Sequence, residues 1–492
     1  MSLPGSEELV GAPPVFAILC DDHDTPLPPK VEGARLFLAG GLCGAPVRIQ
    51  ELPLDGGDGV RLVLGLHPGE FELGAVQTAL RRIGVDPLGV EIVDLPAASG
   101  SADRLTTLLA GAVARVRRFP GATPEETKLR IPGAFSRRAL LRMEAPVYIG
   151  APRIDPQACV AGTGCHVCVP ACPAGALTFA SGSIAYDKET CIACGICVTT
   201  CTTGAVRNPT AVPEGVADQI AAYVRTSQDP AVGVVYICRD GAIPPLPEGM
   251  YPVRVPCTGM LTVGWLLAPL TMGAGTVVAL PCGTVGCGLG NEERLAGVVG
   301  DAATILGVVE AVAGRVGHRL VGPPSPPLPD LEMPEDAFGP AGEAAVVAAL
   351  ASSLAAPEAE IALGSARLGW VTIDEAVCTA CTRCAQVCPT DALAHRDVDG
   401  TIEIDFDPML CVACGTCVEV CPESGANELW RGLRWPDLVA GPQVLRRETT
   451  ATCEVCGGPI APSAMLDRIA AMLGDEHAAT LKLISRRCLR CR

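Results

Sequence analysis

Aromatic residues are scarce in this 492-residue chain, at 3% of the sequence, and only 6 histidines occur. Positive charge is also in deficit, because 37 Lys and Arg face 54 Asp and Glu and leave a formal net charge of -17. A nucleic-acid partner requires a basic face for its phosphates, so this composition argues against such a partner. The opening residues, MSLPGSEELVGAPP, lack a basic start and an apolar core, which predicts no secretory signal and a cytoplasmic protein.

Sequence signatures of common catalytic sites are missing too. No serine or cysteine nucleophile with a histidine base stands out, no phosphate-binding loop appears, and no GxGxxG opens an α/β segment. The uncharged run from Met260 to Leu280 has the length of a membrane span, but Pro269, Gly273 and Gly275 interrupt it. It is predicted to form a buried helix, a turn and a buried strand. Whether the chain is an enzyme stays open, because no substrate site is visible.

Cysteine, in contrast, is abundant, with 26 in the chain. In a cytoplasmic protein, cysteines at short regular spacings indicate metal or redox centres more often than disulfides. CIACGICVTTC at residues 191–201 recurs as CVACGTCVEVC at residues 411–421.

The repeat extends upstream of these cysteines. PVFAILC ends at Cys20 and VGVVYIC ends at Cys238, and each apolar run is followed by a second one, a β-branched run, a Gly-rich turn and a helical pattern. We predict a tandem duplication of one unit, a parallel-sheet α/β domain followed by a cysteine-rich module. The alternative is that two α/β segments resemble each other only because all α/β segments do.

The predicted fold class is therefore α/β plus α+β, with a small tail after the second copy. The predicted domains are a degenerate α/β domain (1–125), a linker helix and first two-cluster ferredoxin module (126–212), a second α/β domain (213–325), a Pro-rich linker and helix (326–365), a second ferredoxin module (366–430) and a zinc-ribbon-like tail (431–492).

The second module carries C-x2-C-x2-C-x3-C-P twice, ending in Pro389 and in Pro422. The pattern resembles that of bacterial-type two-cluster ferredoxins. Thiolates are soft ligands that suit iron, and three on one short loop can bind three corners of a 4Fe-4S cluster. In ferredoxins of this type the fourth cysteine of each run ligates the other cluster. The resemblance implies one cluster on Cys378, Cys381, Cys384 and Cys421, and a second on Cys411, Cys414, Cys417 and Cys388.

Zinc and plain structural cysteine are the competing interpretations of this module. Zinc modules pair two CxxC units at a distance and do not pack four cysteines into eleven residues twice, which favours iron–sulfur clusters.

The first module departs from this pattern at two places. The insertion VAGTG separates Cys159 from Cys165, and Thr202 stands where the second run would have proline. If the fourth cysteine of each run again ligates the other cluster, this module holds two more 4Fe-4S clusters, which brings the predicted total to four. Their ligands are Cys159, Cys165, Cys168 and Cys201 for one cluster, and Cys191, Cys194, Cys197 and Cys172 for the other.

The second α/β segment carries cysteines at the ends of three apolar runs, Cys238, Cys257 and Cys282, with Cys287 in the following turn. Parallel sheets bind ligands at the carboxyl ends of their strands, so these residues predict a four-thiolate site. The alternative is that they are buried cysteines acting as small apolar side chains.

Residues 215–310 resemble the delta (iron-sulfur) subunit of methyl-viologen-reducing hydrogenase, found with heterodisulfide reductase complexes. The resemblance rests on the cysteine that ends the first strand, VRVPCTGML, PCGTVGC and Gly290-Asn291. It implies a 2Fe-2S centre that receives electrons from one redox partner and passes them to another. Members of this family usually have a second cysteine just after the first strand, whereas this chain has Arg239, Asp240 and Gly241.

The first α/β segment keeps only Cys20 and Cys43, and its loop reads LHPGEFE instead of PCGTVGC. Two thiolates cannot hold such a cluster, so this domain is expected to be a structural shell or a docking surface. His67, a lone histidine in a turn, is expected to be solvated.

The tail contains CEVC at 453–456 and CLRC at 488–491, around one helical pattern, SAMLDRIAAML. Two CxxC pairs that converge on one metal are typical of a structural zinc site, here on Cys453, Cys456, Cys488 and Cys491. A rubredoxin-like single iron or another cluster is the alternative.

Several one-electron centres without a visible substrate site indicate an electron-transfer subunit of a cytoplasmic oxidoreductase complex, resembling hydrogenase or heterodisulfide reductase assemblies. Its expected partners are other redox subunits, flavin-containing or catalytic. A metal-stabilised scaffold with structural clusters is the alternative from another class. A third possibility is a free-standing enzyme with an unrecognised flavin pocket.

Overall fold

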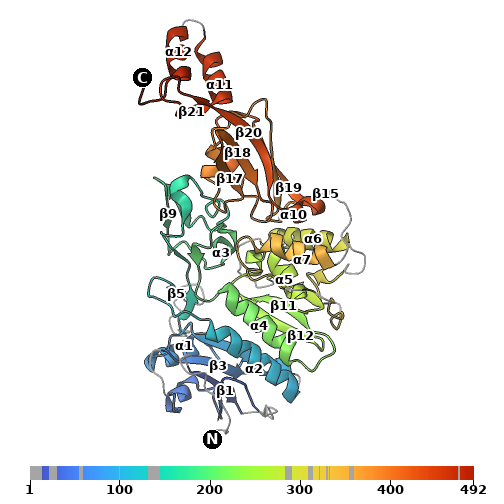
Figure 1. Cartoon of the computed structure of the whole chain (residues 1–492). Helices are drawn as coiled ribbons and strands as arrows, with labels where there is room; N and C mark the ends of the chain where they lie inside the picture. The colour runs from blue at the N-terminus through green and yellow to red at the C-terminus, as the bar shows by residue number, and fades with distance from the viewer. Residues whose placement is uncertain are drawn as a thin grey trace.

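The computed structural model describes residues 14–21, 30–54, 59–98, 100–130, 145–282, 291–308, 314–320, 322–328, 331, 333–353, 360–474 and 477–491. Figure 1 shows an elongated molecule, with the N-terminal sheet at one end and the C-terminal tail at the other. Among the helices in these ranges, none has the length and apolar character needed to cross a bilayer.

The N-terminal domain is a four-stranded parallel sheet with strand order β2-β1-β3-β4. The central strands β1 and β3 are buried along their whole length, because helices and loops cover both faces of a parallel sheet. The elements are β1 (Val15–Cys20), β2 (Arg35–Ala39), β3 (Arg61–Leu66), α1 (Leu73–Arg82), β4 (Val90–Asp94) and α2 (Ala102–Arg117).

The second α/β domain repeats this topology, since its parallel sheet has the order β12-β11-β13-β14. The parallel pairing predicted for both segments is confirmed. The run 260–280 forms a buried helix, a turn and a strand, also as predicted. The elements are α4 (Pro213–Thr226), β11 (Gly233–Cys238), β12 (Met250–Val255), α5 (Val263–Thr271), β13 (Thr276–Ala279), α6 (Glu292–Gly307) and β14 (Val316–Gly317).

Helices α2 and α4 join the two α/β domains, and they lie side by side in Figure 1. The ring of Tyr223 on α4 packs so closely on Gly111 of α2 that a Cβ there would lie 2.2 Å from Tyr223 Cε1. Arg104 Nη2 of α2 donates to the Met250 carbonyl at 2.6 Å. The two cores therefore merge into one continuous apolar cluster.

The cysteine-rich modules share one plan, a pair of outer strands around a β-hairpin. In the first module β7 pairs antiparallel with β10, and β8 with β9. In the second module β16 pairs with β19, and β17 with β18. The elements are β5 (Thr127–Arg130), β6 (Val147–Gly150), β7 (Arg153–Ile154), β8 (Leu177–Ala180), β9 (Ser183–Tyr186), α3 (Ile196–Thr200) and β10 (Val206–Arg207), then β15 (Glu360–Ala362), β16 (Gly369–Ile373), α8 (Arg383–Gln386), β17 (Leu393–Val398), β18 (Thr401–Phe406), α9 (Thr416–Glu419) and β19 (Asn427–Arg434).

The tail continues the sheet of the second module. Strand β20 pairs with β18, which gives a sheet of order β17-β18-β20-β21, and the sequence did not predict this connection. Two helices follow where one was predicted. The elements are α10 (Trp435–Ala440), β20 (Gln443–Thr452), β21 (Pro459–Pro462), α11 (Ser463–Leu473) and α12 (Ala478–Arg486).

Two carboxylates fix the segment that enters the second module to the second α/β domain. Asp301 Oδ2 on α6 accepts from the backbone N–H groups of Ser365 at 2.5 Å and Ala366 at 2.8 Å. Glu343, buried in α7 (Gly342–Ser353), accepts from the N–H groups of Arg367 at 2.5 Å and Gly264 at 3.0 Å. The second module is therefore held directly against helices α5, α6 and α7.

Candidate iron–sulfur sites

Three of the four ferredoxin-type loops share an unusual backbone. The residue before the second cysteine is an alanine with positive φ in each, namely Ala193 (54°), Ala380 (52°) and Ala413 (49°). This left-handed conformation is uncommon for residues other than glycine. It turns backbone N–H groups toward sulfur, since Ala193 N donates to Cys191 Sγ at 3.2 Å and Ala380 N to Cys378 Sγ at 3.4 Å. Such hydrogen bonds stabilise a thiolate that is bound to iron.

The fourth loop is rebuilt around the gap between Cys159 and Cys165, which holds five residues where the other loops have two. Residues Val160–Thr163 form a 3-10 turn that ends at Gly164, whose φ is 110°. Thr202, which replaces the expected proline, places its Oγ1 3.8 Å from Cys165 Sγ. Both departures noted in the sequence therefore meet at one place.

The structure brings one cysteine of each run beside the first three of the other run. Three small cavities, with largely apolar walls, are each lined by four such cysteines. We number the cysteine sets in their order along the molecule, and groups 1 and 3 are defined below. These three sets are group 2 (Cys172, Cys191, Cys194, Cys197), group 4 (Cys388, Cys411, Cys414, Cys417) and group 5 (Cys378, Cys381, Cys384, Cys421). Four converging thiols in a small apolar cavity fit a 4Fe-4S cluster, although ligation itself stays a prediction.

The remaining ferredoxin-type cysteines, Cys159, Cys165, Cys168 and Cys201, form group 3. Burial raises the pKa of Cys168 to about 12, and the charges of Cys201, Cys165 and Cys159 act in the same direction. These four thiols are therefore close enough to interact electrostatically. Burial without a cation favours the protonated thiol, whereas bound iron favours the thiolate.

The second α/β domain brings Cys238 and Cys257 together at the carboxyl edge of its sheet. Thr258 N donates to Cys238 Sγ at 3.2 Å, and Gly259 N donates to Cys257 Sγ at 3.3 Å. Asn291 Nδ2 adds a third donor, 3.2 Å from Cys257 Sγ. Hydrogen bonding to Cys238 lowers the pKa of Cys257, and Gly259 and Asn291 lower it further, against burial. The hydrogen bonds therefore make the thiolate form of Cys257 more favourable than in an ordinary cysteine.

Cys282 follows β13 at the same edge and is half-buried against the core. Cys287, the fourth predicted ligand, lies outside the described residues. Cys238, Cys257 and Cys282 form group 1. A two-iron cluster binds two cysteines on each iron, and the close pair of Cys238 and Cys257 suits one of these irons.

The structure also places a cysteine pair at the carboxyl edge of the N-terminal sheet, and His67 joins it. Cys20, Cys43 and His67 offer ligand atoms that all lie within 4.8 Å of one another. His67 Nδ1 is 3.5 Å from Cys43 Sγ, so the expectation of a solvated side chain is wrong. The sequence signal was available, because His67 follows β3 as Cys282 follows β13.

In the tail, the four predicted cysteines converge. Cys453, Cys456, Cys488 and Cys491 have sulfur atoms within 4.8 Å of one another, and Cys456 Sγ lies 3.6 Å from Cys488 Sγ. Two sulfurs on one tetrahedral zinc are about 3.8 Å apart. Hydrogen bonds from the backbone at Cys488 and Cys456 lower the pKa of Cys453 to about 6. The geometry fits a single tetrahedral ion.

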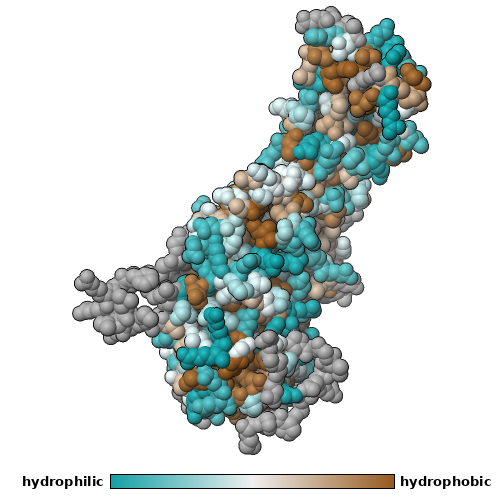
Figure 2. Space-filling model, turned by 90° about the vertical axis from the view of Figure 1, so that its left-hand side faces the viewer, coloured by the Kyte–Doolittle hydropathy of each residue, from teal (hydrophilic) through white to brown (hydrophobic). Residues whose placement is uncertain are grey.

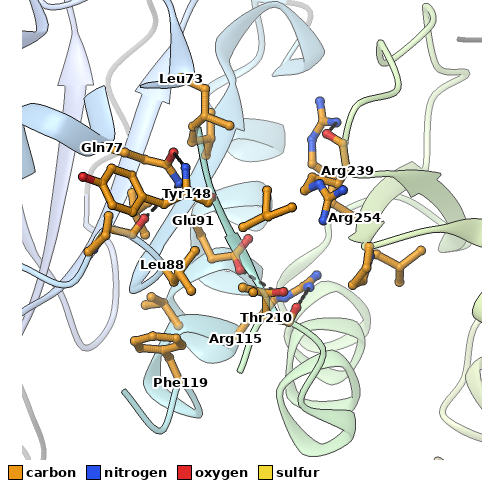
Figure 3. Close-up of a pocket in the computed structure, with 18 of the residues that line it drawn as sticks. Leu73, Gln77, Leu88, Glu91, Arg115, Phe119, Tyr148, Thr210, Arg239 and Arg254 are labelled. Atoms are coloured by element: carbon orange, nitrogen blue, oxygen red, sulfur yellow. Dashed lines mark hydrogen bonds and ion pairs between the residues drawn. The ribbon is translucent and has the colours of Figure 1, made fainter. Parts of the chain in front are cut away.

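A cavity of about 410 Å³ lies between the two α/β domains and strand β6. Figure 3 shows Arg239 and Arg254 on one side of it and Leu73, Gln77 and Tyr148 on the other. Arg239 Nη1 donates at 3.3 Å to the carbonyl of Ala193, which belongs to the loop of group 2. Ile149, another lining residue, packs on Ala193 as well.

The paired charges of this cavity are locally balanced. Arg115 forms an ion pair with Glu91 at 3.1 Å, and Arg254 forms one with Asp94 at 3.1 Å. Arg239 Nε is buried and has no partner in the described part of the chain. The cavity therefore combines apolar walls with charged side chains that are largely paired with one another.

Comparison with known families matches the second module and the later part of the first. A 4Fe-4S dicluster domain matches residues 377–425, and a 4Fe-4S binding domain matches residues 184–207. No curated protein matches the chain. The protein therefore contains two ferredoxin-type iron–sulfur domains, and such domains indicate a role in electron transfer.

In the predicted arrangement, the fourth cysteine of each run ligates the cluster of the other run. Two double variants that share Cys421→Ala test this arrangement. Cys378→Ala with Cys421→Ala should remove only the cluster of group 5, a loss of about four iron atoms per chain. Cys417→Ala with Cys421→Ala should damage groups 4 and 5 together, a loss of about eight. Iron and sulfide analysis of the anaerobically purified chains measures both. If each run holds its own cluster, the two losses will be interchanged.

Proposed function

We propose that the chain is an electron-transfer subunit that relays electrons between two redox partners through five iron–sulfur groups. When bound, 4Fe-4S and 2Fe-2S clusters supply one-electron carriers at these positions. The observation that carries the proposal is that the five cysteine groups adjoin one another in a single order, from group 1 to group 5. The following contacts define this order.

Groups 1 and 2 adjoin across a direct contact between their loops. Gly195, beside Cys194, faces the 256–260 loop so closely that a Cβ there would lie 2.9 Å from Met260 Sδ. Thr199 Oγ1 donates to the Met260 carbonyl at 2.5 Å. The charge of Cys194 also acts on the thiol of Cys257, so the two groups interact electrostatically.

Within each module, the two groups are neighbours. Burial raises the pKa of Cys197 in group 2, and the charge of Cys168 in group 3 adds to this effect. Burial raises the pKa of Cys417 in group 4 to about 12, with a contribution from Cys384 of group 5.

The contact between the two modules joins groups 3 and 4. Burial raises the pKa of Cys165 in group 3, and the charge of Cys414 in group 4 acts in the same direction. Arg367 lies at this junction. Its Nη1 donates to the Thr199 carbonyl at 2.5 Å, and its Nη2 is buried without a partner in the described residues. Burial lowers its pKa, while Glu343, Cys201 and Cys414 oppose that shift.

A buried cation between two iron–sulfur groups stabilises added negative charge. An arginine stays protonated even when burial lowers its pKa, because its ordinary pKa is so high. Arg367 is thus placed to favour the reduced state on both sides of the module junction. No pattern in the sequence pointed to this role, since the residue lies between the linker and the first strand of the second module.

The proposal also includes a tandem duplication, a 2Fe-2S site, a zinc site and redox partners. The identical strand order of the two α/β sheets supports the tandem duplication. Group 1, at the carboxyl edge of the second sheet, supports a 2Fe-2S site like that of the hydrogenase delta subunits, and the tail supports one zinc. The partners would be redox subunits of a cytoplasmic complex.

The tail offers a surface for such a partner. Val455, Met472 and Leu489 are 62%, 71% and 84% exposed. Figure 2 shows apolar surface gathered at this end of the molecule. Exposed apolar side chains that lie together are typical of protein contacts.

The main alternative, a scaffold with structural clusters, is separated from electron transfer by a redox titration. The anaerobically purified chain should contain about eighteen iron atoms and should be reduced and reoxidised reversibly, with all clusters cycling. Electron paramagnetic resonance during a potentiometric titration measures this. Clusters that degrade on reduction would support the scaffold, and an iron content near sixteen would remove the 2Fe-2S site.

Arg367 gives a second test, at the module junction. Arg367→Gln should lower the reduction potentials of the clusters of groups 3 and 4 by roughly 50 mV, close to the 59 mV that equals a tenfold change for one electron. Arg367→Lys should retain most of the wild-type potential because it keeps the charge. Arg207→Gln, at an exposed arginine of β10, is the matched control. Equal potentials in all four proteins would remove this role from Arg367.

The cavity beside group 2 favours a second candidate function, an oxidoreductase that binds its own flavin. Its volume is in the range of small-molecule sites, and it lies at a domain interface, as such sites often do. The protein would then release flavin on anaerobic unfolding, visible in absorbance and fluorescence. Leu88→Trp, which fills the cavity, should abolish the flavin while leaving the iron content unchanged. A flavin-free wild-type chain would exclude this candidate.

A further inference from the structure

The N-terminal α/β domain holds a ligand cluster that no iron–sulfur assignment uses. Cys20 ends β1, Cys43 follows β2, and His67 follows β3. Cys20 is 0% exposed and Cys43 2% exposed, while His67 is half-buried. The three residues come from three neighbouring parallel strands and meet at one edge of the sheet.

The second α/β domain has a cysteine at each equivalent position. Cys238 ends β11, Cys257 follows β12 and Cys282 follows β13. His67 therefore stands where the other domain has Cys282. Imidazole and thiolate are both ligands of zinc and iron, so this difference changes the donor set without removing a donor.

The distances between the donor atoms distinguish a site for a single ion from a site for a cluster. A 4Fe-4S cluster holds its cysteines further apart than one ion does, because each sulfur binds a different iron. In the described residues, only two sets of three or more donors lie within 4.8 Å of one another. One is the tail set of four cysteines, and the other is Cys20, Cys43 and His67.

The distance between His67 and Cys43 fits one tetrahedral zinc. Zn–S bonds of about 2.3 Å and Zn–N bonds of about 2.0 Å place sulfur and nitrogen about 3.5 Å apart. Cys43 Sγ and His67 Nδ1 are 3.5 Å apart. The backbone N–H of His67 also donates to Cys43 Sγ at 3.2 Å, which supports a thiolate in the way that outer hydrogen bonds support metal ligands.

We propose that Cys20, Cys43 and His67 bind one zinc ion through two thiolates and a neutral imidazole. The charges of Zn²⁺ and two thiolates cancel, which suits an edge that is almost fully buried. Three protein ligands leave a fourth position for water, the arrangement found in zinc sites that activate water. Glu70 lies close to the site, since its charge acts on Cys43 and its backbone N–H donates to the His67 carbonyl.

Plain core packing is the competing explanation. Buried cysteines commonly act as small apolar side chains, and two of them at a sheet edge need no metal. A thiol–imidazole hydrogen bond would account for the contact of His67 with Cys43, whereas a single ion accounts for the convergence of all three ligand atoms. Core packing also predicts that the thiols stay free to react in the unfolded chain without any metal release.

The test uses the full chain, purified anaerobically, with the tail set removed by Cys488→Ser and Cys491→Ser. This tail variant should retain about one zinc ion per chain. Its zinc-edge X-ray absorption should show two sulfur neighbours together with lighter atoms. Adding His67→Ala should reduce the zinc to less than about a tenth of that amount, with the iron content unchanged.

Two further variants guard against a loss of zinc through misfolding. His67→Cys, added to the tail variant, should keep the zinc and raise the number of sulfur neighbours to three. His318→Ala removes an exposed histidine near β14 and should change nothing. A tail variant without zinc, one with iron in its place, or zinc that survives His67→Ala would overturn the proposal.

Discussion

The placement of one cysteine from each run beside three from the other run is the constraint on which the ferredoxin-type domains depend. It links the two halves of each module, because each group of four cysteines needs residues from both runs. The left-handed alanines and the backbone N–H groups directed at sulfur serve this closure. The insertion after Cys159 and the exchange of proline for Thr202 change the loop but not the convergence of its cysteines.

The two α/β domains show how one sheet edge supports different chemistry. Parallel strands deliver successive residues to the same edge, so a change of one side chain alters the donor set without disturbing the fold. Cys238 and Cys257 keep a partner cysteine along the edge, whereas Cys20 and Cys43 meet His67 instead. The zinc proposal would give the N-terminal domain a metal site of its own, at the edge where the second α/β domain has its cysteines.

Local patterns in the sequence predicted the elements and most of the site. Apolar runs that stop at cysteine predicted the central parallel strands, and the cysteine spacing predicted both ferredoxin-type domains. What escaped prediction depends on contacts between distant segments. Strand β20 joins the sheet of the second module through pairing with β18. His67 and Arg367 acquire their surroundings only when remote strands and loops meet.

The packing of Tyr223 on Gly111, and the carboxylates of Asp301 and Glu343 on the segment before the second module, leave little freedom between the parts of the chain. A carrier that swings between partners needs a hinge, and these contacts fill the places where a hinge would lie. In the proposed electron-transfer role, the distances between the cysteine groups would therefore be set by the fold. Regulation of the transfer would then rest with the proposed partner proteins and not with a movement inside this chain.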